Sequence, residues 1–414
     1  MKVLVIGSGA REHALCRSLA ADPEVTAVAC APGNAGTGEV AMNLPLDAVQ
    51  PEPIADLAER WGADLVVIGP EAPLVAGAAD AVRARGIDCF GPSAAAAQIE
   101  GSKAFAKQVM AAAGVPTAMA HVCETPDEVA AALDAFGPPY VVKDDGLAAG
   151  KGVVVTTDRD EALAHAAACG RVVVEEFLDG PEVSLFAVTD GSTVCPLQPA
   201  QDFKRVGDGD TGPNTGGMGA YSPLPWVSGV FVDEVLTQVL QPTIDEMGRR
   251  GTPFAGLLYA GLVLSSRGLR VIEFNARFGD PETQVVLARL RSPLGVLLRQ
   301  AATGELRDRP ALAWDAGAAV TVVVAADGYP AQPRSGDPIG GLADAAAVEG
   351  AYVLHAGTRL GADGEVLSNG GRVLSVVGTG TDLAQARERA YAAAARVSLV
   401  GSHHRSDIAL AASS

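Results

Sequence analysis

Two oxygen-bearing side chains, Glu273 and Asn275, stand one residue apart at the end of a largely apolar segment. Residues i and i+2 of a β-strand point to the same face, so this carboxylate and this carboxamide are predicted to converge. Such oxygen ligands suit a hard divalent cation like Mg²⁺, which often shares its ligands with nucleotide phosphates. Arg277, Asp280 and Glu282 follow within seven residues. The alternative interpretation is an edge strand that runs into a solvated loop.

A second segment, 140–155, combines glycines and lysines between two apolar runs. Glycine lets a backbone approach phosphate oxygens closely, and lysine supplies a positive charge for them. The segment is no Walker loop, because Gly152 stands where that motif requires Ser or Thr. We therefore expect a strand, a glycine-rich lid over a nucleotide that includes Lys151, and a second strand. A β-hairpin with a basic tip remains the alternative.

Composition narrows the class of protein. The 414 residues suffice for two to four domains, and 48% of them are hydrophobic, as in ordinary globular proteins. The net charge of −18 argues against a nucleic-acid partner or an acidic membrane surface. Six cysteines without a CxxC pair are typical of reduced thiols. Since no signal peptide or membrane span is apparent, we expect a cytoplasmic protein.

Residues 1 to about 100 alternate short apolar strands, near 2–6, 25–30, 64–68 and 88–90, with helical patterns. This alternation predicts a doubly wound parallel sheet, whose ligands gather at the carboxyl ends of the strands. The turn Gly7-x-Gly9 resembles a dinucleotide fingerprint, but the third glycine is absent and no acidic residue ends the second strand. A phosphate or sugar-phosphate near Gly9 and Arg11 fits better. His13 is expected on the helix surface or capping local structure.

Further along, a helix is expected in the stretch from about 102 to 118, with Ser102 as its N-cap and Gly114-Val115-Pro116 as its stop signal. A helix near 159–168 and a strand over 172–178 follow. The region 180–300 is rich in strands. After about 310, expected strands at 320–325 and from 370, and a helix at 382–397, predict a small α+β domain. We therefore expect domains at 1–101, 102–305 and 306–414.

Five segments, 5–14, 69–74, 146–153, 212–223 and 273–283, carry a resemblance that covers nearly the whole chain. In this order they resemble the glycinamide ribonucleotide synthetase family of the ATP-grasp superfamily. The resemblance implies an α/β and α+β multidomain fold. It has an N-terminal doubly wound parallel sheet, an ATP-grasp core with a small lid subdomain at about 119–178, and a small C-terminal α+β domain.

The resemblance also implies roles for single residues. Lys103 and Lys143 would contact ATP phosphates beneath the lid, and Glu182 would bind the ribose. The adenine would be read by a hinge of four residues, Glu175, Glu176, Phe177 and Leu178. Glu273 and Asn275 would hold the metal. The glycine and sugar-phosphate pocket would contain Asp202, Gly216, Gly217, Met218, Gly219, Arg277 and Asp280. Of these residues, Lys143, Arg277 and Asp202 would be catalytic.

The implied reaction is ATP-dependent ligation of glycine to 5-phosphoribosylamine through a glycyl phosphate, in purine biosynthesis, with Mg²⁺ or Mn²⁺ and a monomeric chain. Two departures from the family pattern stand out. The segment 156–171 is short, which predicts a trimmed lid, and Phe203 stands where a histidine is common. One rival hypothesis is another ATP-grasp ligase with a different acceptor. The other is a nucleotide-sensing or dinucleotide-binding protein without turnover.

Overall fold

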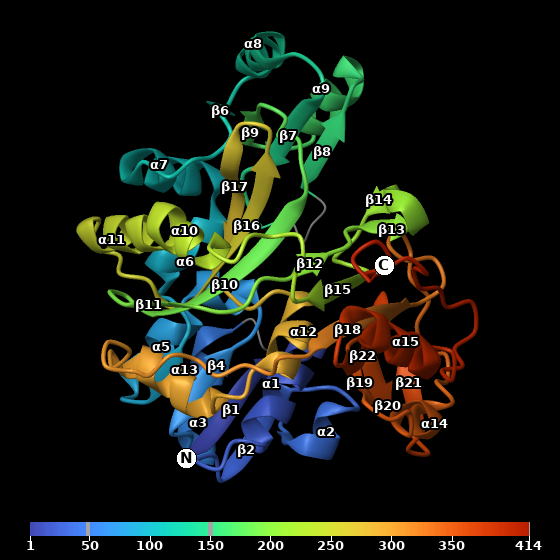
Figure 1. Cartoon of the computed structure of the whole chain (residues 1–414). Helices are drawn as coiled ribbons and strands as arrows, with labels where there is room; N and C mark the ends of the chain where they lie inside the picture. Colours follow the sequence, from blue (N-terminus) through green and yellow to red (C-terminus); the bar gives the residue numbers. More distant parts are fainter. Residues whose placement is uncertain (47–49, 148–151, 414) are drawn as a thin grey trace.

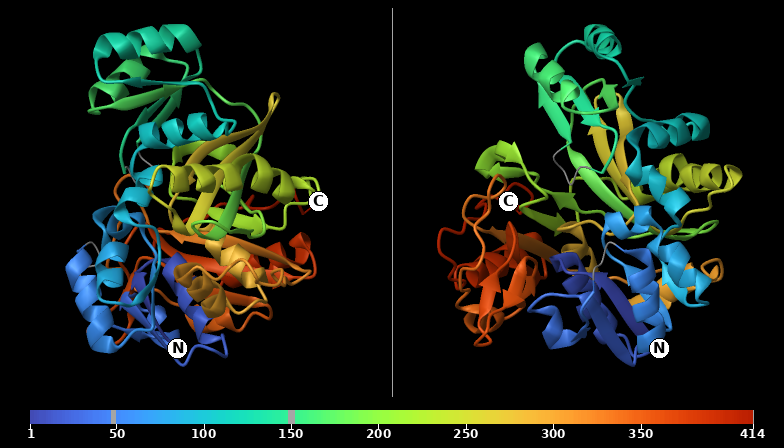
Figure 2. Two further views of the ribbon diagram at one scale, coloured as in Figure 1. Left: turned by 90° about the vertical axis from the view of Figure 1, so that its left-hand side faces the viewer. Right: turned by 180° about the vertical axis from the view of Figure 1, so that it is seen from behind.

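The computed structural model describes residues 1–46, 50–147 and 152–413. Its N-terminal and C-terminal parts lie side by side, and a central antiparallel sheet rises above them (Figure 1). A separate small layer, formed by the segments 120–144 and 153–175, stands at the far end of the central sheet in all views (Figure 2). Among the helices of the described ranges, none has the length and apolar character needed to cross a membrane.

The N-terminal sheet is parallel and doubly wound, as predicted. Its strand order is β3 (Met42–Asn43), β2 (Ala27–Pro32), β1 (Lys2–Gly7), β4 (Leu65–Ile68) and β5 (Asp88–Phe90). The associated helices are α1 (Ala10–Ala20), α2 (Thr37–Val40), α3 (Pro51–Trp61), α4 (Glu71–Ala76), α5 (Ala78–Ala84) and α6 (Ala94–Gly101). Residues 3–6 of β1 are fully buried, which explains their continuous apolar pattern.

The central sheet is antiparallel, in the order β11 (Val194–Pro196), β10 (Glu182–Asp190), β16 (Ala255–Ser265) and β17 (Gly268–Asn275). Its neighbours in the chain are α7 (Lys103–Ala113), α10 (Phe231–Val235), a π-helix (Leu236–Leu240), α11 (Gln241–Arg249) and α13 (Leu294–Thr303). The predicted helix after Ser102 is confirmed as α7. The Ser102 hydroxyl accepts from the N–H of Phe105, and Gly114, with a φ of 68°, ends the helix.

The small layer is a sheet in the order β6 (Ala120–Cys123), β9 (Val172–Glu175), β7 (Tyr140–Asp144) and β8 (Val153–Thr156). We call it the lid sheet. It is covered by α8 (Pro126–Phe136) and α9 (Arg159–Ala167) and has a separate hydrophobic core. β7 and β8 form the expected antiparallel pair. The strand predicted over 172–178 is shorter in the structure, where β9 ends at Glu175.

The third large sheet joins distant parts of the chain. Its order is β12 (Gln201–Asp202), β15 (Gly219–Ser222), β18 (Ala318–Ala325), β22 (Arg372–Gly380) and β19 (Ala351–His355). Around it lie α12 (Glu282–Arg289), α14 (Leu342–Ala346), α15 (Leu383–Ala394) and two small pairs, β13 (Arg205–Gly207) with β14 (Thr211–Asn214) and β20 (Thr358–Leu360) with β21 (Val366–Ser368). A short 3₁₀ turn spans Asp208–Asp210. The sheet therefore takes strands from both sides of residue 306.

A buried histidine pair ties the N-terminal sheet to this third sheet. His13 of α1 is 4% exposed, and its Nδ1 accepts from the N–H of His355 at 2.9 Å. Asn34 adds a bond to the carbonyl of His355 at 2.8 Å. The expectation that His13 lies on the helix surface is wrong, because β19 covers that face of α1.

Candidate active site

Glu273 lies on β17, opposite Gly261 of β16, and next to a bulge in their pairing. Among the described residues, its carboxylate has no hydrogen bond or ion pair. Burial alone would raise the pKa of Glu273, but four nearby cations hold it below its usual value. These cations are Lys204, Lys143, Lys103 and Arg277. The carboxylate is thus ionised and available at a positively charged site.

Asn275 follows on the same strand, and its side-chain oxygen accepts only a long bond, 3.4 Å, from Arg277. Both predicted metal ligands therefore offer oxygens at the end of β17. The described residues contain no group of three or more His, Cys, Asp or Glu arranged for a metal. Two protein oxygens fit a Mg²⁺-like ion that takes its other ligands from phosphates and water.

Lys143, on β7, is held in place by a buried carboxylate. Its Nζ lies 2.8 Å from Glu175 and 3.3 Å from the carbonyl of Ile272. The other oxygen of Glu175 lies 3.0 Å from Lys107 of α7. The Glu175 side chain, predicted to belong to the adenine hinge, therefore orients Lys143, the lysine predicted to contact phosphate. Lys107 was not predicted, because nothing in its local sequence indicates this partner.

The lid hairpin is anchored to the start of α7. Lys103 donates to the carbonyl of Gly146 at 3.0 Å. Asp145 accepts from the Ser102 hydroxyl and from the N–H of Ala104, and Arg171 pairs with the same carboxylate. The tip itself, with Lys151, lies outside the described residues. The contacts around it place Lys103 directly beneath the hairpin.

The segment after β9 has the features of a hinge. Glu176 pairs with Arg267 at 2.8 Å, and its carboxylate accepts from the N–H of Met119. Phe177 is 45% exposed. Within the described ranges, the N–H groups of Phe177 and Leu178 donate to no protein acceptor. A planar base with acceptor atoms could therefore bind to this backbone.

A cluster of carboxylates surrounds Lys204. Glu182 of β10 forms an ion pair with it, and Asp202 of β12 is nearby. Burial raises the pKa of Asp202 to about 7, with Glu282 adding to the effect and Lys204 opposing it. Glu282 is itself buried and accepts from the hydroxyl of Tyr259 at 2.5 Å. Asp202 is therefore suited to exchange a proton near neutral pH.

Arg277 has partners inside the protein. Its guanidinium lies 3.1 Å from Glu71 and 2.8 Å from Glu100. Burial disfavours its charge, but these two carboxylates raise the pKa of Arg277. Glu100 also accepts from the N–H of Ala276 at 2.7 Å. The three side chains fix the chain immediately after the Glu273–Asn275 pair to helices α4 and α6 of the N-terminal part. Sequence reasoning did not identify either glutamate.

Two of the predicted sugar-phosphate residues adjoin a cavity of about 610 Å³. Gly9 and Asp280 line it, together with Arg359 and Arg372. Arg372 donates to the carbonyls of Gly216 and Asp280, both at 2.7 Å. The turn 216–219 is thereby fixed against Asp280. Gly217 has a φ of +111°, and a Cβ there would lie 2.4 Å from Pro281. Met218 is buried beneath this turn, and Gly219 begins β15.

The amino end of α1 is already occupied by carboxylates. Glu12 accepts from the N–H of Gly9 at 2.6 Å and from Arg11 at 2.5 Å, and Asp280 accepts from the N–H of Arg11 at 3.2 Å. These oxygens fill the place where a dinucleotide phosphate would bind. The side chain of Arg11 is buried and also donates to the carbonyl of Phe278. Glu12 stands where the third glycine of the dinucleotide fingerprint would be, and its carboxylate makes these contacts instead.

Comparisons with known proteins give the family of the chain. Three models of the phosphoribosylglycinamide synthetase family match the chain: the N domain at residues 1–100, the ATP-grasp (A) domain at 101–283 and the C domain at 319–411. A phosphoribosylamine–glycine ligase from Streptomyces coelicolor is 70% identical, covering 99% of each chain. One from Mycobacterium leprae is 58% identical over 100% of this chain and 98% of its own.

Among solved structures, a phosphoribosylamine–glycine ligase from Thermotoga maritima is similar with a TM-score of 0.85 and 33% identity, over 99% of this chain and 100% of that one. The biotin carboxylase domain of a 2-oxoglutarate carboxylase from Hydrogenobacter thermophilus has a TM-score of 0.74 and 18% identity, over 97% and 91%. The latter likeness concerns the fold alone. From its three matching domains and its full-length relatives, the chain belongs to the phosphoribosylglycinamide synthetase family.

Proposed function

We propose that this chain joins glycine to 5-phosphoribosylamine at the expense of ATP, giving glycinamide ribonucleotide, ADP and phosphate in purine biosynthesis. The observation that carries the proposal is the unpaired Glu273 carboxylate, which lies among four cations at the end of β17. A triphosphate with a divalent metal complements this charge arrangement. The full-length relatives, all phosphoribosylamine–glycine ligases, support the same substrates.

In this proposal ATP lies between the lid sheet and the central sheet. Lys103, Lys143 and Lys151 contact its phosphates, and Glu182 binds the ribose. The carboxylate of Glu175 is paired with Lys143, and that of Glu176 is paired with Arg267. Because both side chains are occupied, the adenine is bound mainly by the backbone of Phe177 and Leu178. Glu273 and Asn275 would hold Mg²⁺ or Mn²⁺, and the metal would supply positive charge that stabilises the transferring phosphoryl group.

The chemistry requires an activated carboxyl group. The glycine carboxylate attacks the γ-phosphorus, ADP leaves, and glycyl phosphate forms. The amine of phosphoribosylamine then attacks the carbonyl carbon and expels phosphate. Asp202, whose pKa is raised to about 7 by burial, accepts the proton that the amine loses. Lys143 stabilises charge on the transferred group, and the remaining work is orientation.

We assign the acceptor to the cavity beside Gly9 and Asp280, whose lining residue Arg372 holds the turn 216–219. Arg359, which sequence reasoning did not identify and which forms no ion pair within the described ranges, is a candidate phosphate ligand there, and Arg372, which pairs with Asp280 at 3.2 Å, lines the same cavity. Arg11 and Arg277 were expected to contact substrate. Because Glu12, Glu71 and Glu100 occupy their guanidinium groups, we propose that both are positioning residues. Arg11 supports the start of α1, and Arg277 supports the end of β17.

The proposed organisation keeps domain boundaries near residues 101 and 305, with a monomeric chain. The experiment that tests the activity measures ADP release with ATP, glycine and phosphoribosylamine, omitting each in turn. Release that requires all three substrates supports the proposal. Full release with another carboxylate or amine in place of glycine or phosphoribosylamine would instead indicate a different ATP-grasp ligase. Binding of ATP without turnover would indicate a nucleotide sensor.

A further inference from the structure

Tyr329 lies in the turn Gly328-Tyr329-Pro330 that follows β18, and none of the roles proposed above uses it. Its hydroxyl accepts a hydrogen bond from the N–H of Gly216 at 2.9 Å, although the two residues stand 113 positions apart in the chain. Gly216 begins the turn 216–219, which the proposed function assigns to the acceptor site. A side chain of the C-terminal domain therefore contacts the backbone of this turn directly.

The backbone of Gly216 is held from two sides by this domain. Its N–H donates to Tyr329, and its carbonyl accepts from Arg372 of β22 at 2.7 Å. Arg372 also donates to the carbonyl of Asp280 at 2.7 Å and pairs with the Asp280 carboxylate at 3.2 Å. Because Asp280 lines the acceptor cavity, Tyr329 and Arg372 together set how the turn lies relative to that cavity.

The ring of Tyr329 fits against Gly371, the residue before Arg372. A Cβ at Gly371 would lie 2.2 Å from the Tyr329 ring. The φ of Gly371 is outside the left-handed region, so the space for the ring, and not the backbone conformation, favours glycine here. The carbonyl of Gly371 accepts from the N–H of Ala326 at 2.8 Å, which joins the loop that carries Tyr329 to the start of β22. The hydroxyl is thus presented to Gly216 from a fixed position.

We propose that Tyr329 is a positioning residue for the ligase reaction. Its hydroxyl holds the Gly216 peptide, and through it the turn 216–219, in the orientation that receives phosphoribosylamine. This inference rests on the function proposed above, which assigns the turn to the acceptor. Tyr329 acts through the backbone of the turn and takes no part in ATP binding. Loss of the hydroxyl should therefore weaken use of the acceptor and leave use of ATP unchanged.

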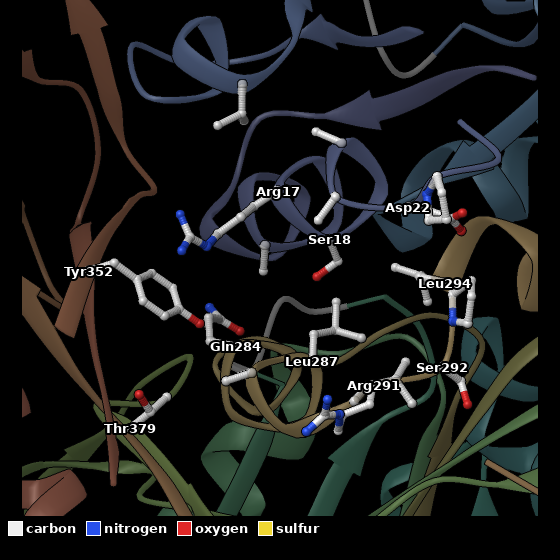
Figure 3. A pocket seen from close by; sticks show the side chains of 18 of the residues that line it. Arg17, Ser18, Asp22, Gln284, Leu287, Arg291, Ser292, Leu294, Tyr352 and Thr379 are labelled. Atoms are coloured by element: carbon white, nitrogen blue, oxygen red, sulfur yellow. The ribbon is translucent and has the colours of Figure 1, made fainter. Parts of the chain in front are cut away.

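Tyr329→Phe removes the hydroxyl and keeps the ring. We expect the KM for phosphoribosylamine to rise about fivefold, the effect of one net hydrogen bond, while the KM for ATP stays within about twofold of the wild type. Tyr352→Phe is the matched control and should keep the wild-type KM values. Tyr352 lines a cavity of about 780 Å³ between α1, α12 and β19 (Figure 3), and its hydroxyl makes no hydrogen bond to a residue of the described ranges.

A second variant displaces the same hydroxyl without altering Tyr329. Gly371→Ala places a methyl group against the ring, so it should raise the KM for phosphoribosylamine at least as much as Tyr329→Phe. If both changes act by breaking the bond to Gly216, the double variant should be no worse than Gly371→Ala alone. Gly248→Ala in α11, where a Cβ meets no atom within 4 Å, is the control for this substitution.

Hydrogen exchange of the Gly216 amide, followed by mass spectrometry of the peptide that contains it, measures the contact without turnover. Exchange should be faster in Tyr329→Phe and Gly371→Ala than in the wild type and both controls, while thermal melting verifies that each variant is folded. A KM increase confined to phosphoribosylamine, together with faster exchange and no additivity in the double variant, supports the proposal.

Four results would each overturn the role of Tyr329. They are an unchanged KM for phosphoribosylamine in Tyr329→Phe, equal increases in the KM values of all substrates, additive effects in the double variant, and unchanged exchange of the Gly216 amide. Wild-type protein that lacks ligase turnover but gives the expected exchange pattern would overturn the proposed function and, with it, the role of Tyr329 in ligation.

Discussion

Lys143 and Lys107 share the carboxylate of Glu175, so a comparison of the two lysines tests the catalytic role proposed for Lys143. Lys143→Ala removes a cation beside Glu273, and loss of one preorganised electrostatic contact lowers turnover by about 10²–10³. Lys107→Ala removes the other half of the same ion-pair group. Its thermal unfolding should change comparably, but turnover should fall far less. Equal turnover in the two variants would move the phosphate role away from Lys143.

Glu273→Gln retains the volume of the side chain and removes its charge. We expect the variant to fold normally and, at limiting Mg²⁺, to turn over about 10²-fold more slowly, because one charged ligand is lost. Steady-state rates over a Mg²⁺ titration measure this. Glu349→Gln, at an exposed carboxylate, is the control. A wild-type rate for Glu273→Gln at limiting Mg²⁺ would refute the metal assignment.

The convergence of Glu273 and Asn275 at the end of one strand could be predicted from the sequence, but the partners of the site residues could not. The spacing of Glu273 and Asn275 on a strand predicted that their side chains share a face. The glycine-rich segment around Lys143 predicted a phosphate-binding loop. Glu71 stands 206 residues from Arg277 in the chain, so no local pattern connects them. For the same reason the occupied guanidinium of Arg277 was not foreseen. Pairing between distant residues depends on how the domains pack.

At the scale of elements, the turn 216–219 depends on a backbone shape that only glycine adopts easily. Gly217 has a φ of +111°, and a Cβ would overlap Pro281. Gly217→Ala should therefore displace the turn from Asp280 and raise the KM for phosphoribosylamine about tenfold, an order typical of about 1–3 kcal/mol of strain. The KM for ATP should change much less.

Gly209→Ala is the matched control for that substitution. Gly209 also has a positive φ, of 65°, but a Cβ there meets no atom within 4 Å. It tests backbone strain away from the acceptor cavity. Initial-rate kinetics with phosphoribosylamine generated in the assay distinguish the two variants. Indistinguishable KM values would argue against a role for the turn in binding the acceptor.

Element positions followed from the sequence where alternation and caps were clear. β4 and β5 begin within a residue of their predicted starts, and α7 begins after its predicted cap. The strand predicted to 178 ends at Glu175, because Glu176 turns to Met119 and Arg267. The pairing of β15 with β18, from opposite sides of residue 306, was not predicted, because strand partners across domains leave no local pattern.

On the scale of the whole molecule, the buried pair His13 and His355 makes the junction of two sheets sensitive to acid. Burial, with His355 and Arg17 nearby, lowers the pKa of His13 from 6.5 to about 3, and burial lowers the pKa of His355 to about 4. As the pH falls, these two histidines therefore bind protons in the unfolded chain before they do so in the folded chain. The free energy of unfolding should fall from pH 7 to pH 5, by about 2 kcal/mol for His13 alone.

Denaturant unfolding at several pH values measures this slope. His13→Gln retains an acceptor for the N–H of His355 but cannot be protonated, so its slope should be shallower than that of the wild type. His121→Gln, at an exposed histidine, should leave the slope unchanged. Equal slopes for all three proteins would show that another group controls the acid sensitivity of the fold.

The central claim is that the molecule ligates glycine through an acyl phosphate, and the path of one oxygen atom tests it. When the glycine carboxylate attacks the γ-phosphorus, its bridging oxygen stays on phosphorus as the amine expels phosphate. Glycine labelled with ¹⁸O in the carboxylate should therefore deliver one labelled oxygen to inorganic phosphate per turnover, measured by the ³¹P isotope shift. An adenylate route would place the label in AMP. Unlabelled phosphate alongside normal product would contradict the account.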